Sequence, residues 1–231
     1  MKFLNVKKLL PFILLLAIAA VSIFYKIAVL NVAADDKDPK LVALTFDDGP
    51  GKYTEKLLDG LRERDVKASF FVLGTNAESN KDMIERMFEE GHLIGNHTYN
   101  HVQLTTLTVD KACDEINKTN NLIYDITGKK VKYIRPPFGV WSEDLECMNN
   151  MTTVMWNVDP LDWSIQNTNK VVKHVLKNVT DGSIILLHDT YGTSVDAALK
   201  IVDELKKQGY EFVTIDKMVE SYNEGWDEED D

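Results

Sequence analysis

Past residue 40, short β-rich runs alternate with longer segments of helical period, and this alternation limits the chain to few folds. We expect strands at Leu41–Phe46, Ser69–Leu73, Leu93–Gly95, Val131–Ile134, Thr152–Val158, Ser183–Leu187 and Glu211–Val213. Helices are expected at Tyr53–Arg64, Lys81–Glu90, Val109–Thr127, Ser142–Met148, Asn169–Asn178, Val195–Gln208 and Asp216–Tyr222. Seven strands alternating with helices imply parallel pairing, in either an open doubly wound α/β sheet or a barrel.

Polar side chains that can do chemistry follow the strands of this pattern. In both candidate folds, ligands bind at the carboxyl ends of the strands. These positions hold Asp47 and Asp48 after the first strand, His97 and His101 after the third, Arg135 after the fourth, Asp159 and Asp162 after the fifth, and His188 after the sixth. We therefore expect them to gather on one rim of the fold. His92 and His174 have no such neighbours, and we interpret them as structural.

Two histidines and one acid of this set form a candidate metal site. His97 and His101 are four residues apart, so on a helical turn both rings would face the same way and could share one ion. A carboxylate from the first strand completes the ligand set, and we assign Asp48 to this role. Alone, an Asp-Asp-Gly-Pro run is more often only a turn. Zinc is the first expectation for one divalent ion, and iron, cobalt or nickel suit the same ligands.

The remaining residues of the rim have the types needed for acid–base catalysis. Asp47 stays free to take a proton from an attacking water, and Arg135 is expected to hold it ionised and in position. His188 ends a continuous apolar run, so it is either a core histidine bonded to the backbone or a general acid oriented by Asp162. Trp163, beside Asp162, either walls the site or packs in the core.

Near the amino terminus, three lysines precede the apolar run Leu9–Tyr25. The run is about as long as the minimum of roughly 17 residues for a bilayer helix, and longer than the usual core of a signal peptide. We expect an uncleaved anchor with the lysines on the cytoplasmic side, although cleavage after Ala34 also fits the small-residue rule. In both cases residues 1–34 would place the folded part outside the cytoplasmic membrane.

The chain is acidic, with a net charge of −11, and its first 34 residues carry four lysines and no acid, so the rest carries −15. Such a body repels phosphate backbones, which argues against a nucleic-acid partner. Part of the charge lies in an acidic tail at 223–231, which leaves 35–222 as one folded domain that we expect to be monomeric. Cys113 and Cys147 lack the spacing of a zinc knuckle, and they either pair in an oxidising compartment or stay as small buried hydrophobes.

Five motifs in this order resemble the polysaccharide deacetylase family, the NodB-type domain of carbohydrate esterase family four. They are Thr45–Gly49, His97–His101, Arg135–Gly139, Asp159–Trp163 and Leu186–His188, and the resemblance spans Leu41 to about Tyr222. It implies a distorted (β/α)7 barrel and metal-dependent removal of N- or O-acetyl groups from extracellular glycans. The residue roles that it implies are Asp48, His97 and His101 as metal ligands, Asp47 as base with Arg135 beside it, His188 as acid supported by Asp162, and the backbone N–H of Phe138 as part of the oxyanion site.

The expected location favours peptidoglycan, at its N-acetylglucosamine or N-acetylmuramic acid residues, over chitooligosaccharides or acetylxylan. Two other classes of function stay open, namely a glycan-binding protein that has lost hydrolysis and a cytoplasmic hydrolase of small amides or cyclic ureas. The complete set of expected ligands, base and acid argues against the first class. The apolar run Leu9–Tyr25 argues against the second.

Overall fold

The computed structural model describes residues 39–142, 147 and 150–227. The expected anchor at Leu9–Tyr25 and most of the helix expected at Ser142–Met148 lie outside these residues. Within the described part of the chain, no helix is both long and apolar enough to cross a membrane. The described residues from Lys40 onward belong to one compact unit.

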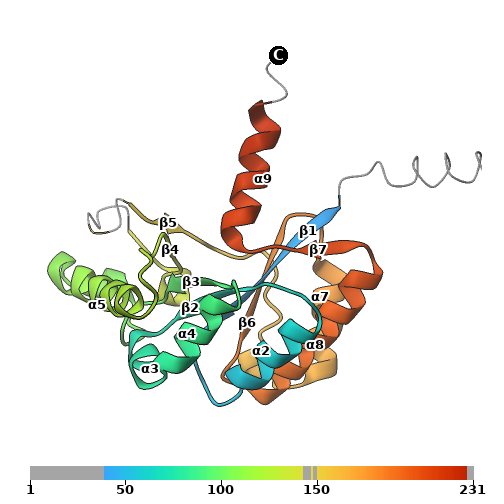
Figure 1. Ribbon diagram of the computed structural model, residues 1–231, viewed down its shortest axis with the longest axis horizontal. Coiled ribbons are helices and arrows are strands. Elements are labelled where there is room, and N and C mark those ends of the chain that lie inside the picture. The colour runs from blue at the N-terminus through green and yellow to red at the C-terminus, as the bar shows by residue number, and fades with distance from the viewer. Residues whose placement is uncertain (1–38, 143–146, 148–149, 228–231) are drawn as a thin grey trace, which may run out of the picture. The chain divides into compact units, whose positions relative to one another are not determined.

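A single parallel sheet forms the centre of this unit (Figure 1). Its strands are β1 (Lys40–Asp47), β2 (Ser69–Val72), β3 (Leu93–Asn96), β4 (Tyr133–Ile134), β5 (Thr152–Thr153), β6 (Ser183–His188) and β7 (Tyr210–Phe212). Six of them pair in the order β5-β4-β3-β2-β1-β6, and every pairing is parallel. The seven strands and their parallel pairing were predicted from the alternation in the sequence, and both predictions are confirmed.

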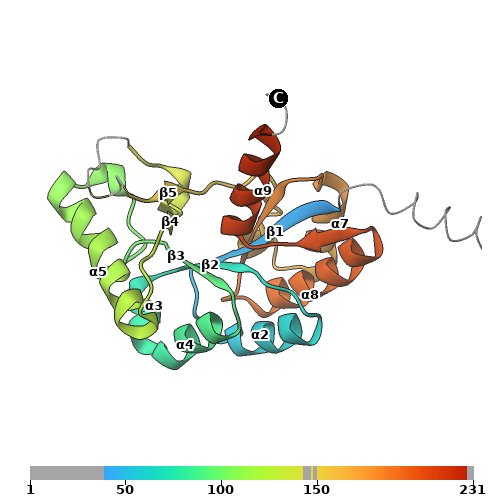
Figure 2. The same cartoon turned by 45° about the horizontal axis from the view of Figure 1, so that its top comes forward.

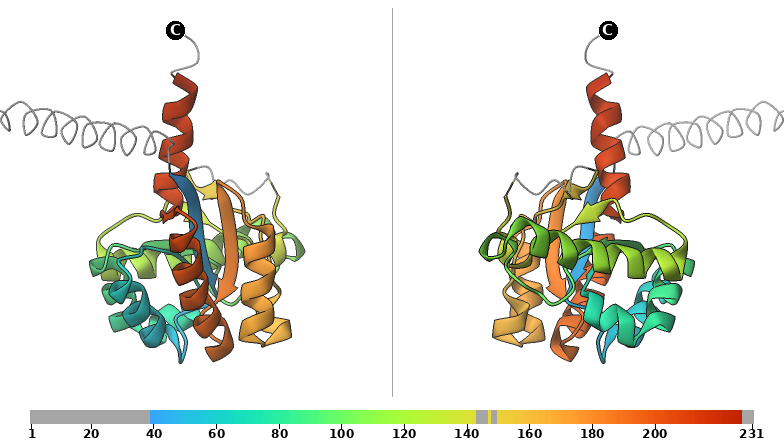
Figure 3. Two further views of the ribbon diagram at one scale, coloured as in Figure 1. Left: turned by 90° about the vertical axis from the view of Figure 1, so that its right-hand side faces the viewer. Right: turned by 90° about the vertical axis from the view of Figure 1, so that its left-hand side faces the viewer.

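Most of the helices cover the outer face of the sheet (Figure 2). The helices of the described part of the chain are α2 (Thr54–Glu63), α3 (Gly74–Ser79), α4 (Lys81–Glu89), α5 (Val109–Thr127), α6 (Asp162–Ile165), α7 (Thr168–Asn178), α8 (Gly192–Lys207) and α9 (Ile215–Asp227), with short 3-10 turns η1 (Leu104–Thr106) and η2 (Pro137–Gly139). The predictions missed α3 and α6, which are too short to show a helical period. The helix expected at Asp216–Tyr222 runs on to Asp227 as α9, which packs on the sheet through Ile215 and Met218 at its start and then projects beyond it (Figure 3).

The sheet is curled into a half-barrel rather than closed into a ring. β5 and β6 form its two ends, and an isolated bridge between Val158 and Ile185 takes the place of a regular strand pairing between the chain after β5 and β6. β7 does not extend the path beyond β6; it pairs with β1 at Lys40–Val42, a part of β1 that β2 does not reach. The expectation of a distorted barrel therefore holds only in this coarser form.

The strand expected at Thr152–Val158 is wrong after Thr153, and a buried arginine explains why. The carbonyl oxygens of Val154 and Met155 accept hydrogen bonds from the Arg135 guanidinium, at 3.1 and 3.3 Å. These oxygens are thus turned toward an interior side chain, and the ladder with β4 ends.

The alternation of side chains along β1 separates the core from the site. Val42, Leu44 and Phe46 belong to the large core between the sheet and the helices. Ala43 packs in a smaller cluster with Phe71 and with Ile215 of α9. Because successive strand residues point to opposite faces, Thr45 and Asp47 share the inner face with Ala43 and lie nearer the carboxyl end. The pattern of β1 therefore delivers a carboxylate to the open end of the half-barrel.

Candidate active site

A cavity of about 320 Å³ opens at the carboxyl ends of the strands. It is lined by Asp47, Asp48, His97, His101, Pro136, Phe138, Trp156, Asp159, Trp163, Leu186, His188 and Tyr191. All the sequence-predicted site residues except Arg135 and Asp162 line it directly, and those two contact residues that do. The expectation that the acids and imidazoles meet on one rim is confirmed.

Asp48, His97 and His101 converge within this cavity. Their candidate ligand atoms all lie within 4.8 Å of one another, and Asp48 Oδ1 is 3.4 Å from Nε2 of both histidines. Asp48 Oδ1 is buried and has no hydrogen-bond partner among the described residues. An orphaned carboxylate oxygen facing two imidazole nitrogens fits a divalent cation, and a carboxylate with two histidines is a common catalytic zinc set.

The two histidines meet through a loop rather than through a helical turn, which corrects the sequence-based geometry. Residues 97–101 are not helical, and both Thr98 and His101 have a positive φ, 67° and 57°. His97 Nδ1 lies 2.5 Å from the carbonyl oxygen of Arg135, to which it donates, so the other ring nitrogen is left with a lone pair toward Asp48. Burial also lowers the pKa of His97, which keeps the ring neutral.

Asp47 lies beside this cluster and is held by the buried guanidinium of Arg135. Asp47 Oδ1 accepts a 2.8 Å hydrogen bond from Arg135, which donates equally to Thr45 Oγ1. The other carboxylate oxygen of Asp47 faces the cavity, 3.8 Å from His97 Nε2. Arg135 has no exposed surface and stacks on the ring of Phe71. The predicted pair of acid and guanidinium is therefore present, with one oxygen fixed and one facing the cavity.

His188 is oriented by Asp162, as one of the two sequence interpretations expected. Both oxygens of the fully buried Asp162 are used: one lies 2.8 Å from His188 Nδ1, and the other accepts from the His188 backbone N–H at 2.9 Å. Burial opposes a charge on His188, but the hydrogen bond to Asp162 and the charges of Asp162, Asp47 and Asp48 outweigh it and raise its pKa to about 9. The second ring nitrogen of His188, Nε2, faces the cavity 3.9 Å from Asp48 Oδ2.

Aromatic side chains form the walls of the cavity. Phe138, in the left-handed backbone region at φ 62°, packs the edge of its ring against His101. Trp163 is half exposed and walls the site, so it is not a core residue. The sequence analysis missed Trp156 and Tyr191. Trp156 was hidden inside the overlong strand prediction, whereas Tyr191, three residues after His188, could have been found by its place after β6.

The sequence analysis also missed a buried carboxyl group that lies against Gly49, the last residue of the first motif. Asp189 has no exposed surface, accepts a hydrogen bond from Thr54 Oγ1, and lies so close to Gly49 that a Cβ there would be 2.4 Å from its oxygens. This close approach leaves no room for a side chain, so position 49 requires glycine. Burial also raises the pKa of Asp189 to about 7.

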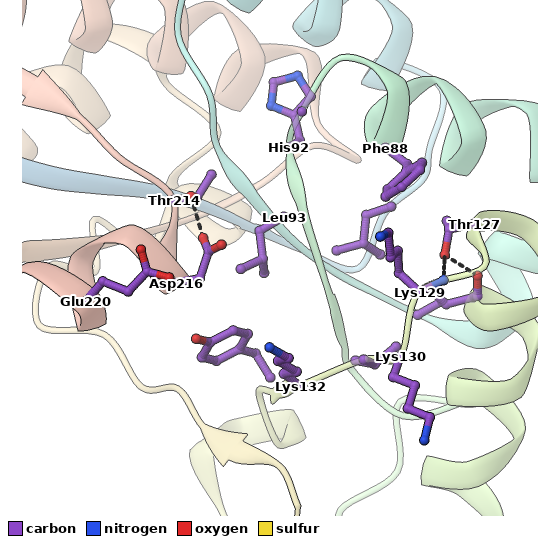
Figure 4. Close-up of a pocket in the computed structure, with 15 residues that line it drawn as sticks. Phe88, His92, Leu93, Thr127, Lys129, Lys130, Lys132, Thr214, Asp216 and Glu220 are labelled. Carbon is purple, nitrogen blue, oxygen red and sulfur yellow. Dashed lines mark hydrogen bonds between the residues drawn. The ribbon is translucent and has the colours of Figure 1, made fainter.

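The remaining histidines lie away from the site, as expected. His92 lines a second cavity, of about 290 Å³, where Asp216 and Glu220 lie on one side and Lys129 and Lys130 on the other (Figure 4). Its Nδ1 accepts from the backbone N–H of Ala68, so it has a structural contact. His174 is exposed on α7.

Comparison with known proteins places these motifs in a family. The family model for polysaccharide deacetylase matches residues 34–155. The chain is 40% identical over 186 residues to the peptidoglycan-N-acetylmuramic acid deacetylase PdaC of Bacillus subtilis, covering 80% of this chain and 40% of PdaC, so it spans about two fifths of that protein's length. It is 41% identical to a peptidoglycan-N-acetylglucosamine deacetylase of Bacillus cereus, covering 79% of this chain and 70% of the relative.

A solved structure shows the same fold. The structure of PdaC from Bacillus subtilis superposes with a TM-score of 0.80 at 38% identity, covering 83% of this chain and 96% of that one. The sequence identity, the shared fold and the five motifs on one rim lead to the same assignment. The chain belongs to the polysaccharide deacetylase family.

Proposed function

We propose that this protein is a metal-dependent polysaccharide deacetylase that hydrolyses the N-acetyl groups of peptidoglycan, at N-acetylglucosamine or N-acetylmuramic acid. One observation carries the proposal: an orphaned Asp48 oxygen faces His97 and His101, with the Asp47 carboxylate 3.8 Å from His97 Nε2 and the His188 imidazole 3.9 Å from Asp48 Oδ2. The relatives at about 40% identity act on these two sugars, and they support the choice of substrate.

The protein side chains divide the reaction between them. A divalent ion held by Asp48, His97 and His101 would supply Lewis acidity toward the acetyl carbonyl and the attacking water. Asp47 takes the proton of that water through its cavity-facing oxygen, while Arg135 holds the other oxygen. The water oxygen bonds to the acetyl carbon, and the backbone N–H of Phe138 donates to the resulting oxyanion.

His188 completes the reaction as a general acid. The bond between the acetyl carbon and the sugar nitrogen breaks as His188 gives its proton to the nitrogen, so the products are acetate and the free amino sugar. Asp162 keeps the donating nitrogen turned toward the cavity, because it holds the opposite ring nitrogen. A proton at this position is needed because an unprotonated amine is a poor leaving group.

Zinc is the metal that we propose, since two imidazoles and a carboxylate suit it, and cobalt, nickel or iron fit the same set. We further propose that the protein works on the outer face of the cytoplasmic membrane, held there by residues 1–34 or secreted if they are removed. The apolar run Leu9–Tyr25 supports this location. Fractionation of producing cells tests it: recovery of the protein in the cytosol would contradict it.

The activity is tested by acetate release. The purified protein, reloaded with zinc, cobalt or nickel, should release acetate from peptidoglycan, and mass spectrometry of the digested glycan should show free amino sugars. Chitooligosaccharides and acetylxylan serve as competing substrates. Activity on these alone would move the substrate away from peptidoglycan, and no acetate from any substrate with any metal would contradict the proposal.

A further inference from the structure

The loop that joins the two histidine ligands is held by a carboxylate from outside the five motifs. Glu115, on α5, points both of its oxygens at this loop. Glu115 Oε2 accepts from the backbone N–H of Tyr99 at 3.1 Å and from that of Asn100 at 2.8 Å. Its Oε1 accepts from Asn100 Nδ2 at 2.7 Å.

These bonds reach the loop where its backbone is most strained. Thr98 and His101 both have a positive φ, a region that costs a residue with a Cβ free energy and persists only where the surroundings enforce it. Tyr99 and Asn100, the two residues held by Glu115, lie between them. The position of the His101 ring relative to His97 depends on this conformation.

Other backbone groups of the loop form hydrogen bonds elsewhere, whereas the backbone N–H groups of Tyr99 and Asn100 donate to Glu115. The Thr98 N–H donates to Asn96 Oδ1 at 2.6 Å, and the carbonyls of Thr98 and Tyr99 accept from the first amides of α3. Both carboxylate oxygens of Glu115 therefore accept hydrogen bonds from this loop.

We propose that Glu115 is a positioning residue that fixes the geometry of the metal ligands through the backbone of residues 99 and 100. The inference builds on the metal site of the proposed function. It is independent of the substrate, because it concerns the affinity for the ion. Groups that hydrogen-bond the metal ligands themselves typically change metal affinity by about 10- to 100-fold when removed, and we expect the same range for Glu115.

Zinc titration of the purified metal-free protein, in competition with a chromophoric chelator, tests the proposal. Glu115→Ala should weaken zinc binding by about 10- to 100-fold. Glu115→Gln should restore affinity to within about threefold of the wild type, since its amide oxygen can take both backbone N–H groups and Asn100 can turn its side chain to accept. Asp114→Asn, an exposed neighbour on the same helix, is the control for lost charge and should bind zinc normally.

Wild-type affinity in Glu115→Ala would overturn the proposal, as would a Glu115→Gln variant as weak as the alanine variant. Melting of the metal-free variants is measured alongside. If Glu115→Ala does not fold, Glu115→Asp replaces it: that carboxylate keeps its charge but is too short for both amides, so it should bind zinc more weakly than Glu115→Gln. Equal zinc affinities of Glu115→Asp and Glu115→Gln would count against the proposal. A wild type that binds zinc but releases no acetate would contradict the proposed function and leave this inference standing.

Discussion

Two adjacent carboxylates, Asp47 and Asp48, face the same cavity because the chain changes conformation between them. Asp47 is the last residue of β1, and Asp48 has a φ of 72°. In a continuing strand the two side chains would point to opposite faces. The turn is secured by Asn76, whose Nδ2 donates to the Asp48 carbonyl at 2.7 Å. One acid can therefore bind an ion while its neighbour remains free to accept a proton.

This division of roles predicts different failures for two substitutions. Asp47→Asn should keep the affinity for zinc and lower turnover by about 10²- to 10⁴-fold, because it removes the base and leaves the ligands. His101→Ala should weaken zinc binding itself by at least the roughly 100-fold that loss of a supporting group can cost. Zinc titration and acetate release distinguish the two, with His174→Ala as an exposed control. Near-normal turnover of Asp47→Asn would show that another group is the base.

The His188–Asp162 pair predicts an alkaline titration in the metal-free protein. NMR should give His188 a pKa of about 9, well above its ordinary 6.5, because Asp162, Asp47 and Asp48 outweigh its burial. Since the folded-state pKa is raised, the stability that His188 contributes is fully present below pH 6.5 and is lost as the pH rises through about 9.

Asp162→Asn should lower the pKa of His188 by about one pH unit or more, because it removes a negative charge that counteracts the effect of burial. His92, whose pKa burial lowers to about 4, is the internal control, since it lies at the other cavity. An unchanged His188 titration in Asp162→Asn would refute the assignment of Asp162 as its partner.

At the scale of elements, α5 carries both the carboxylate that holds the metal-ligand loop and a disulfide. Cys113 is bonded to Cys147, 34 residues away, which settles the alternative that the sequence left open. The bond ties α5 to the segment that follows η2. α5 is thus tied to the rest of the chain through Cys113 as well as through the hydrogen bonds of Glu115 to the loop 97–101.

Removing this disulfide should destabilise the protein. Closing a loop of this length is worth about 2–4 kcal/mol, so replacing both Cys113 and Cys147 by Ser should lower the melting temperature by about 5–15 °C. Differential scanning calorimetry with and without reductant measures the effect. Reductant should lower the melting temperature of the wild type and leave the double variant unchanged; a wild type that is insensitive to reductant would contradict the bond.

The elements that could be predicted from the sequence are those marked by a pattern of apolar residues within the element itself. The apolar period located α5 at Val109–Thr127, and the run 184–187 located β6. The end of β5 could not be predicted, because it depends on where Arg135 sends its hydrogen bonds. The helical turn predicted for residues 97–101 is wrong, because the spacing of two ligands does not distinguish a helical turn from a loop.

At the scale of the whole molecule, the site depends on the register of strands far apart in the sequence. Asp47 lies directly beside His188 where β1 pairs with β6, although 141 positions separate them. The rule that ligands gather at the carboxyl ends of strands predicted the acids and imidazoles that line the site. It could not predict contacts made through the interior, such as the approach of Asp189 to Gly49, because these depend on packing.

We expect Asp48, His97 and His101 to bind one divalent ion beside the Asp47 carboxylate. A crystal structure of the zinc-loaded protein, with anomalous differences measured at the zinc edge, tests it most directly. One strong peak should lie within about 2.0–2.2 Å of an Asp48 oxygen and of Nε2 of both histidines, with Asp47 outside that distance. A peak bound by other residues, or density at the three ligands with no anomalous signal at saturating zinc, would contradict the claim.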